Sequence, residues 1–153
     1  QLQYFCNEVL SSYASTTSGI DIEFIDALDG RKKYCQVKAG PTTINHDDVD
    51  TILNHFRGIK NLARTNHLDL NITDCVVGVF YGTESSICTS YRKINEQYPV
   101  YVGVEFWHRL TGDAHFYYDL IDAFAEVADE MDSSAMISNL IQQLADQISL
   151  RQG

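Results

Sequence analysis

The alternation of hydrophobic and polar positions predicts two strands joined by a tight turn near the start of the chain. Residues 20–26 alternate strictly, with Ile20, Ile22 and Phe24 on one face, as in a half-buried strand. Residues 33–39 alternate in the same way, and the segment between the two runs contains Leu-Asp-Gly, which is typical of a hairpin turn. We therefore expect an antiparallel β-hairpin.

Apolar residues at helical spacing predict most of the remaining elements. Asn45 is suited to cap a helix because Asp48 follows three residues later. The expected inward stripe of that helix is Val49, Ile52, Leu53, Phe56, Ile59 and Leu62. The expected helices cover residues 2–13, 45–64, 85–98, 105–111, 116–129 and 134–150.

Two further apolar runs predict strands. Residues 74–81 contain the continuous run CVVGVF, which favours an interior strand, and residues 99–104 form a shorter one. The order of elements predicts an α/β fold with a mixed β-sheet flanked by helices. With 153 residues we expect a single domain covering 1–153. The helical pattern begins at once after Gln1, so we also expect the sequence to be part of a longer chain.

Composition and charge narrow the class of protein. The net charge of −10 argues against non-specific nucleic-acid binding, which depends on Lys and Arg neutralising phosphates. Exposed charges are largely screened beyond ~8 Å at physiological salt, however, and acids can gather around a metal ion. No apolar run approaches the ~20 residues of a membrane span.

The four cysteines form no CxxC pair. Cys35 and Cys75 lie within strand-like apolar runs, so we expect buried free thiols. No basic and apolar secretion signal opens the sequence. These observations favour the reducing cytoplasm as the location of the protein.

The predicted hairpin carries a polar face and an apolar face. Because side chains alternate along a strand, the pairing would place Asp21 close to Lys38 and leave the opposite face fully apolar. Such a polar face can be a simple solvated surface or a site with chemistry. The polar face consists of Asp21, Glu23, Gln36 and Lys38, and the apolar face of Ile22, Phe24, Cys35 and Val37.

The hairpin residues resemble a nuclease family. Asp21 followed by Gln36-Val-Lys38 is similar to the motif of the PD-(D/E)XK nuclease superfamily, an Asp on one strand and (Asp/Glu)-x-Lys on the next. The fuller runs SGIDIEFID and YCQVKAGP, with the later YVGVEFWHRLTGD, more narrowly resemble type II restriction endonucleases of the PmeII-like group. The resemblance implies a restriction-endonuclease-like core. It also implies a third core strand before Ile20, for which only residues 13–17 leave room.

The resemblance further implies Mg²⁺-dependent hydrolysis of DNA phosphodiester bonds. Asp21 would be the main metal ligand, and Lys38 would orient the attacking water or stabilise charge on the phosphate. Gln36 departs from the pattern because its neutral carbonyl oxygen replaces a carboxylate. Glu8 or Glu23 could restore the missing charge. The expected catalytic set is therefore Asp21, Gln36, Lys38, Glu8 and Glu23, with Asp21, Gln36 and Glu8 as metal ligands.

Basic and histidine side chains outside the hairpin are candidates for DNA contacts. Each has a simpler alternative: capping of a helix start, a solvated helix face, or packing under a sheet edge. The partner would be double-stranded DNA, which a two-fold homodimer could cut on both strands at a palindrome. The candidates are His46, Arg57, Lys60, Arg64, His108 and Arg109.

Three function classes are consistent with these features. The first is a type II site-specific endonuclease, and the second is a nuclease-like domain that binds DNA but cleaves it weakly or not at all. The third is an acidic protein that mimics DNA. A nuclease needs a few acids close to Lys38, whereas a mimic needs acids arrayed along a surface, so the position of the acids distinguishes them.

Overall fold

The structure, a computed structural model, describes residue 8 and residues 10–129. Its sheet has four strands in the order β1-β2-β3-β4, where β1 pairs antiparallel with β2 and the other neighbours are parallel. This mixed sheet, flanked by helices, confirms the predicted α/β class. The strands are β1 (Ile22–Ile25), β2 (Lys32–Lys38), β3 (Cys75–Val79) and β4 (Val100–Val102).

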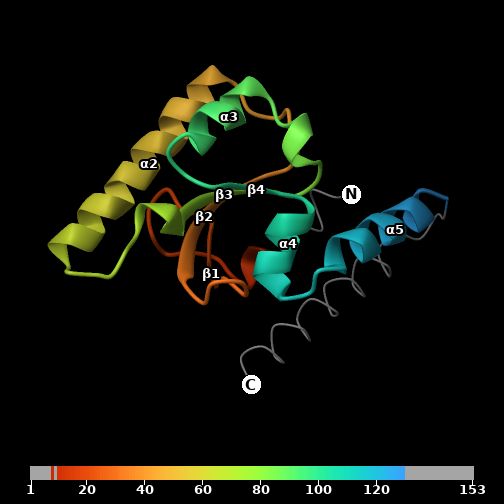
Figure 1. The fold of residues 1–153 in the computed structure, drawn as a ribbon, viewed down its shortest axis with the longest axis horizontal. Helices are drawn as coiled ribbons and strands as arrows, with labels where there is room; N and C mark the ends of the chain where they lie inside the picture. The colour runs from red at the N-terminus through yellow and green to blue at the C-terminus, as the bar shows by residue number, and fades with distance from the viewer. Residues whose placement is uncertain (1–7, 9, 130–153) are drawn as a thin grey trace.

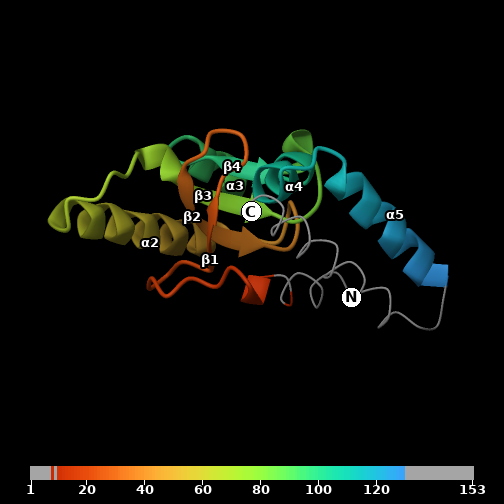
Figure 2. The same ribbon diagram turned by 90° about the horizontal axis from the view of Figure 1, so that it is seen from below.

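Helices cover both faces of the sheet. In Figure 1, α2 and α3 lie on one side of the sheet and α4 lies on the other. Figure 2 shows α5 continuing from α4 and extending beyond the sheet. None of the described helices is long and apolar enough to cross a membrane. The helices are α2 (His46–Thr65), α3 (Thr89–Asn95), α4 (Val104–Thr111) and α5 (Phe116–Asp129), with short 3₁₀ helices η1 (Ile72–Asp74) and η2 (Glu84–Ser86).

The predicted helices agree with the structure to different degrees. The bounds expected for α2 and α5 are nearly those observed. The segment 85–98, expected as one helix, holds only the end of η2 and the seven-residue α3. Of the helix expected at 2–13, residues 8, 10 and 11 are described and helical. The helix expected at 134–150 lies outside the described residues.

Helix α2 begins where its sequence predicts. The Asn45 side chain accepts from the Asp48 backbone N–H at 3.1 Å, and the Asp48 carboxylate accepts from the Asn45 N–H at 2.8 Å. This capping box satisfies two backbone donors that the helix itself leaves unpaired. One predicted stripe position is wrong: Leu62 is 48% exposed, whereas Ala63 is buried. With 3.6 residues per turn, Ala63 lies about two turns after Phe56 on the same face, whereas Leu62 lies to one side of it.

The fold has two hydrophobic cores among its described residues. One lies between the sheet and α2, and the other lies between the sheet and α4. A side chain at Gly78 would place its Cβ 2.3 Å from the Phe106 ring, so the glycine in β3 permits the close approach of α4. Trp107 is fully buried, and its indole N–H donates to the Phe80 carbonyl at 2.8 Å. The five residues of β3 are all buried, as expected for an interior strand.

The prediction that Cys35 and Cys75 are buried free thiols is confirmed. Cys35 and Cys75 are both inaccessible to solvent and form no disulfide. Burial raises the pKa of Cys75 to about 12 and raises that of Cys35 well above its usual range, with the nearby Asp21 carboxylate adding to the effect. Neither thiol is therefore reactive at neutral pH.

The segment before β1 supplies a rudiment of the third strand. Ala14 forms an isolated antiparallel bridge with Ile22, and the Glu23 N–H donates to the Tyr13 carbonyl at 3.1 Å. The expected face of Ile20 is wrong, because Ile20 packs in the α2-side core while Ile22 packs in the α4-side core. The regular strand begins only at Ile22, after the chain turns at Gly19, whose φ is +80°.

The apolar face of the hairpin is also less apolar than predicted. Lys33 shares the face of Phe24, which it pairs with across the hairpin, and is only 1% exposed. Its ammonium lies 2.7 Å from an Asp29 oxygen, 3.4 Å from an Asp74 oxygen and 3.9 Å from an Asp26 oxygen. A buried cation requires such partners. This end of the hairpin is therefore held by ion pairs.

Arg31 and Arg109 complete this buried ion-pair cluster. The Arg31 guanidinium donates to both Asp74 carboxylate oxygens, with distances of 2.7–3.1 Å, and Arg109 donates to Asp26 at 2.8 Å. Burial acts to raise the pKa of Asp74, but hydrogen bonds from Arg31 and the Asn71 N–H, with the charges of Arg31 and Lys33, lower it below its ordinary value of 3.8.

This cluster predicts acid lability. A carboxyl group whose pKa is lowered by folding stabilises the protein above its unfolded pKa, and that stability is lost as the pH falls below 3.8 and through the folded pKa. Asp74→Asn should lower the free energy of unfolding at pH 7 by about 3 kcal/mol and make the acid dependence shallower. Urea unfolding between pH 3 and pH 7 measures both effects.

The matched control is Asp69→Asn, since Asp69 also pairs with Arg31 but is 87% exposed. It should change the free energy of unfolding little, because exposed ion pairs contribute little. An Asp74→Asn variant as stable as the Asp69→Asn variant would contradict the structural role of the cluster.

Candidate active site

Asp21 lies at the start of β1, next to Gln36 on β2. Its backbone N–H donates to the Cys35 carbonyl at 3.0 Å, and its carboxylate accepts from the Val37 N–H at 2.9 Å. The two bonds are made to the residues on either side of Gln36, and they fix Asp21 against β2. Asp21 is exposed, and only one of its two carboxylate oxygens has a hydrogen bond to a described residue. The other oxygen can accept a ligand from solvent.

Gln36 lies beneath α2 and is only 5% exposed. Its amide nitrogen is 2.5 Å from the Gly19 carbonyl oxygen and 2.7 Å from His55 Nδ1. The amide oxygen makes no hydrogen bond with the described residues, and it is not among their buried polar atoms without a partner. It is thus an accessible oxygen that can still accept a ligand.

Lys38 ends β2 on the same face as Gln36, two residues further along the strand. It is half-buried, and no described residue forms a hydrogen bond or ion pair with its ammonium. The Val37 N–H that binds Asp21 directly precedes it. The structure therefore holds Asp21 against β2 through Cys35 and Val37, and it places Gln36 and Lys38 on one face of β2. Their action as one site stays a prediction.

The carboxylate of Glu23 has other partners. One oxygen forms an ion pair with Lys32 at 2.9 Å, and the other accepts from the Ser15 and Thr17 hydroxyl groups. Although burial acts to raise the pKa of Glu23, the bonds from Ser15 and Lys32 outweigh it and lower the pKa. Both oxygens already have donors, so this structure does not offer Glu23 as a metal ligand.

Glu8 is exposed on the short described part of the first helix. Its backbone carbonyl accepts from the Ser11 hydroxyl at 2.7 Å, but its carboxylate has no partner among the described residues. Within the described residues, no group of three or more His, Cys, Asp and Glu side chains converges in a way that could hold a metal ion. The role of Glu8 as a metal ligand stays a prediction.

The donor set at the hairpin nevertheless fits Mg²⁺. This ion binds oxygen ligands, is held by one or two carboxylates together with substrate phosphates, and keeps several waters. Asp21 offers one carboxylate oxygen that no described residue binds, and Gln36 offers one accessible amide oxygen. A metal ion held by these two residues would have a single charged protein ligand.

A comparison with known protein families decides which class this fold and site belong to. The family model of the type II restriction endonuclease EcoO109I matches residues 1–132. The chain belongs to this restriction endonuclease family. No curated protein sequence matches the chain significantly. Family membership makes DNA the substrate class, and the match spans all of the hairpin, α2 and the described helices.

Among the residues expected to contact DNA in this restriction endonuclease, Arg109 has its guanidinium bound within the fold. It donates to Asp26 and Glu105, and its guanidinium lies 4.2 Å from the centroid of the Tyr101 ring. Burial acts to lower the pKa of Arg109, but the bond to Asp26 and the other neighbouring groups raise it. This agrees with the simpler alternative, in which Arg109 packs within the protein. Its neighbour His108 is half-buried in α4.

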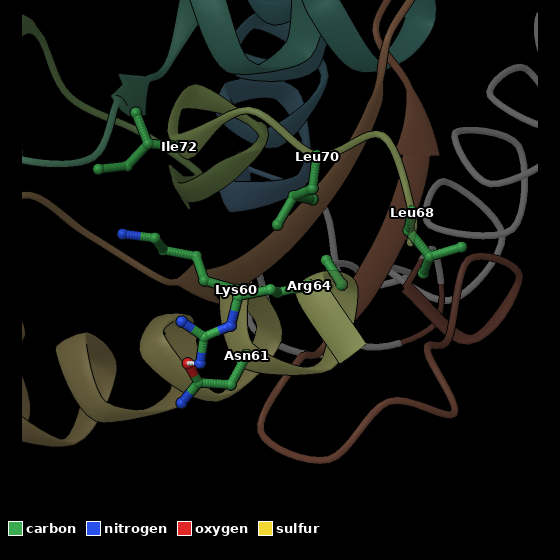
Figure 3. Close-up of a pocket in the computed structure, with 7 residues that line it drawn as sticks. Lys60, Asn61, Arg64, Leu68, Leu70 and Ile72 are labelled. Atoms are coloured by element: carbon green, nitrogen blue, oxygen red, sulfur yellow. Dashed lines mark hydrogen bonds between the residues drawn. The ribbon is translucent and has the colours of Figure 1, made fainter. Parts of the chain in front are cut away.

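The basic residues of α2 remain available at the surface. Within the described part of the chain, Arg57 and Arg64 donate only to Asn54 and Asn61 of their own helix, and Lys60 forms no hydrogen bond or ion pair. The seven residues lining a pocket at the C-terminal end of α2 include Lys60 and Arg64, together with Leu68, Leu70 and Ile72. Figure 3 shows the two basic side chains on the helix side of this pocket and the three apolar ones across from them.

His46 is the first residue of α2 and is exposed. Its side chain forms no hydrogen bond, ion pair or ring contact with the described residues. The capping of the helix is performed by its neighbours Asn45 and Asp48. A DNA contact at His46 therefore stays a prediction.

Sequence reasoning missed His55 and Gly19. His55 directly precedes Phe56 of the inward stripe of α2 and is itself half-buried, at the edge of that stripe. A polar residue beside the stripe was the available signal. Gly19 gave no such signal, since only the folded chain brings its carbonyl to Gln36.

Glu23 provides a test of which acids matter. Glu23→Gln should leave divalent-ion affinity and cleavage unchanged and lower the free energy of unfolding by about 0.5–1 kcal/mol, because it weakens a partly exposed ion pair with Lys32. Calcium titration and urea unfolding measure these quantities. Loss of metal binding would show that Glu23 turns toward Asp21 in solution.

Proposed function

We propose that this family member is a metal-dependent DNA endonuclease of the PD-(D/E)XK type, in the PmeII-like group that the sequence resembles. The observation that supports the proposal is the grouping of Asp21, Gln36 and Lys38 at one end of the hairpin. Asp21 and Gln36 each present an oxygen there that no described residue binds, and the Lys38 ammonium has no hydrogen bond or ion pair with the described residues.

The proposed chemistry is hydrolysis of a phosphodiester bond. Bound Mg²⁺ would supply Lewis-acid activation of a water and stabilisation of charge on the phosphate. Asp21 and Gln36 would hold it. Lys38 donates hydrogen bonds and positive charge where negative charge develops on the phosphate oxygens, which is where such a group accelerates the reaction most.

Binding of double-stranded DNA must overcome a net charge of −10. Lys60 and Arg64 at the C-terminal end of α2 are accessible cations that can contact backbone phosphates. Cutting both strands at a palindromic site is most simply done by a homodimer, since a two-fold axis places one centre at each strand. Both the DNA contacts and the dimer belong to the proposal.

A second candidate function is DNA binding with weak or no cleavage. The presence of Gln36 favours it, because one carboxylate fewer lowers the electrostatic attraction for a divalent cation. The two functions are separated by incubating the protein with plasmid DNA, with and without Mg²⁺, and mapping the ends of any fragments. Defined ends that require Mg²⁺ support the endonuclease, whereas shifted but intact plasmid supports the binding domain.

Asp21→Asn should abolish cleavage and weaken calcium binding while leaving the melting temperature nearly unchanged. The substitution removes the charge but keeps an oxygen for the Val37 N–H, and Asp21 is exposed. Plasmid cleavage, calcium titration and thermal melting measure the three effects. Cleavage at the parent rate would remove Asp21 from the centre.

Lys38→Ala should lower the cleavage rate by about 10²–10³-fold, as expected for loss of one donor to the developing charge, and change metal affinity little. Lys32→Ala is the matched control, since Lys32 lies on the same strand and face but pairs with Glu23. Single-turnover cleavage of plasmid compares them. Equal rates for the two variants would reassign Lys38 to ordinary surface.

A further inference from the structure

The orientation of the Gln36 amide can be derived from its neighbours. A carbonyl oxygen only accepts hydrogen bonds, so the amide atom 2.5 Å from the Gly19 carbonyl must be the nitrogen. That nitrogen also lies 2.7 Å from His55 Nδ1. Because it is a donor with two hydrogens, Nδ1 accepts the second one, and the ring hydrogen is on Nε2 in this contact.

Both amide hydrogens are therefore used, and the oxygen is the end turned away from Gly19 and His55. With the nitrogen held from two sides, rotation of the amide by half a turn would place its oxygen against the Gly19 carbonyl, where two acceptors repel. The two contacts thus fix which end of Gln36 faces a cation. Burial of Gln36 to 5% exposure strengthens this selection, because buried polar groups that lose their partners are costly.

The imidazole of His55 is itself held tightly. A Cβ on Gly19 would lie 2.5 Å from His55 Cγ, so the ring packs directly against the Gly19 backbone. Gly19 also has a φ of +80°, which side chains other than glycine rarely adopt. His55 is half-buried at the edge of the inward stripe of the 20-residue α2, and the buried residues of that stripe pack on the sheet. The acceptor that faces Gln36 is therefore on a rigid element.

We infer that His55 is a positioning residue that, with the Gly19 carbonyl, holds the Gln36 amide so that its oxygen serves as the neutral metal ligand of this endonuclease. The inference rests on the proposed function and deepens it. It also explains why Gln stands where the related pattern has an acid. A Glu at position 36 would place a carboxylate oxygen against the Gly19 carbonyl oxygen, and neither atom can donate a hydrogen bond.

The test compares two substitutions of the histidine. His55→Asn places an amide oxygen where Nδ1 lies and keeps the acceptor, whereas His55→Phe keeps a ring against Gly19 but has no acceptor. Mn²⁺, which favours the same oxygen ligands, is titrated into the free protein. Its binding is followed by paramagnetic broadening of the Asp21 and Val37 amide signals, which detects weak binding without any cleavage.

The parent and His55→Asn should bind Mn²⁺ with similar affinity, and His55→Phe should bind about 10-fold more weakly, the usual effect of losing a group that orients a ligand. In a Gln36→Ala background, His55→Phe should have no further effect, because a residue that acts through Gln36 has nothing left to orient. The side-chain NH₂ signals of Gln36 should be shifted and protected from exchange in the parent and in His55→Asn only.

Gln36→Glu provides a second readout that does not depend on the folding of a histidine variant. It should bind Mn²⁺ no more tightly than the parent despite its added charge, because the Gly19 carbonyl oxygen repels a carboxylate oxygen at this position. Tighter Mn²⁺ binding by Gln36→Glu would overturn the inference. It would also be overturned if His55→Phe bound Mn²⁺ as tightly as the parent while Asp21→Asn no longer bound it. Unchanged affinity in Asp21→Asn would instead overturn the metal centre of the proposed function, and this inference with it.

Discussion

The packing of α2 against the polar side of the β1–β2 hairpin is the constraint on which the rest of the molecule depends. The face of β2 that carries Gln36 and Lys38 continues across the parallel pairing into the apolar side chains of β3. Helix α2 must cover that apolar surface to bury its own stripe. In doing so it also covers Gln36, and a buried amide then needs partners for its hydrogens. His55 and Gly19 supply them.

The two ends of the hairpin solve the problem of buried polar groups differently. Near the turn, Lys33 is enclosed by three carboxylates, and Arg31 and Arg109 bind two of them. At the other end, Asp21 and Lys38 keep groups that no described residue satisfies. Groups with satisfied partners stabilise a fold, whereas charged groups left without partners can bind a ligand. This contrast separates the structural charges from the candidate catalytic ones.

The distribution of the acids also bears on the alternative of a DNA mimic. Asp26, Asp29 and Asp74 gather around Lys33 inside the fold, and Glu23 pairs with Lys32. These acids are neutralised locally instead of being arrayed along a surface. Together with the match to a restriction endonuclease family, this arrangement favours an enzyme in which these acids stabilise the fold.

The sequence by itself determined the α/β class, the hairpin, the capped helix α2 and the shared face of Gln36 and Lys38. Each of these follows from a local rule: side-chain alternation, helical periodicity, or a capping pair three residues apart. Only the tertiary structure decided that Lys33 is buried, that Ile20 and Ile22 enter different cores, that Glu23 turns to Lys32, and that His55 meets Gln36. These outcomes depend on contacts between residues distant in sequence or on where the chain turns, and local periodicity carries no information about either.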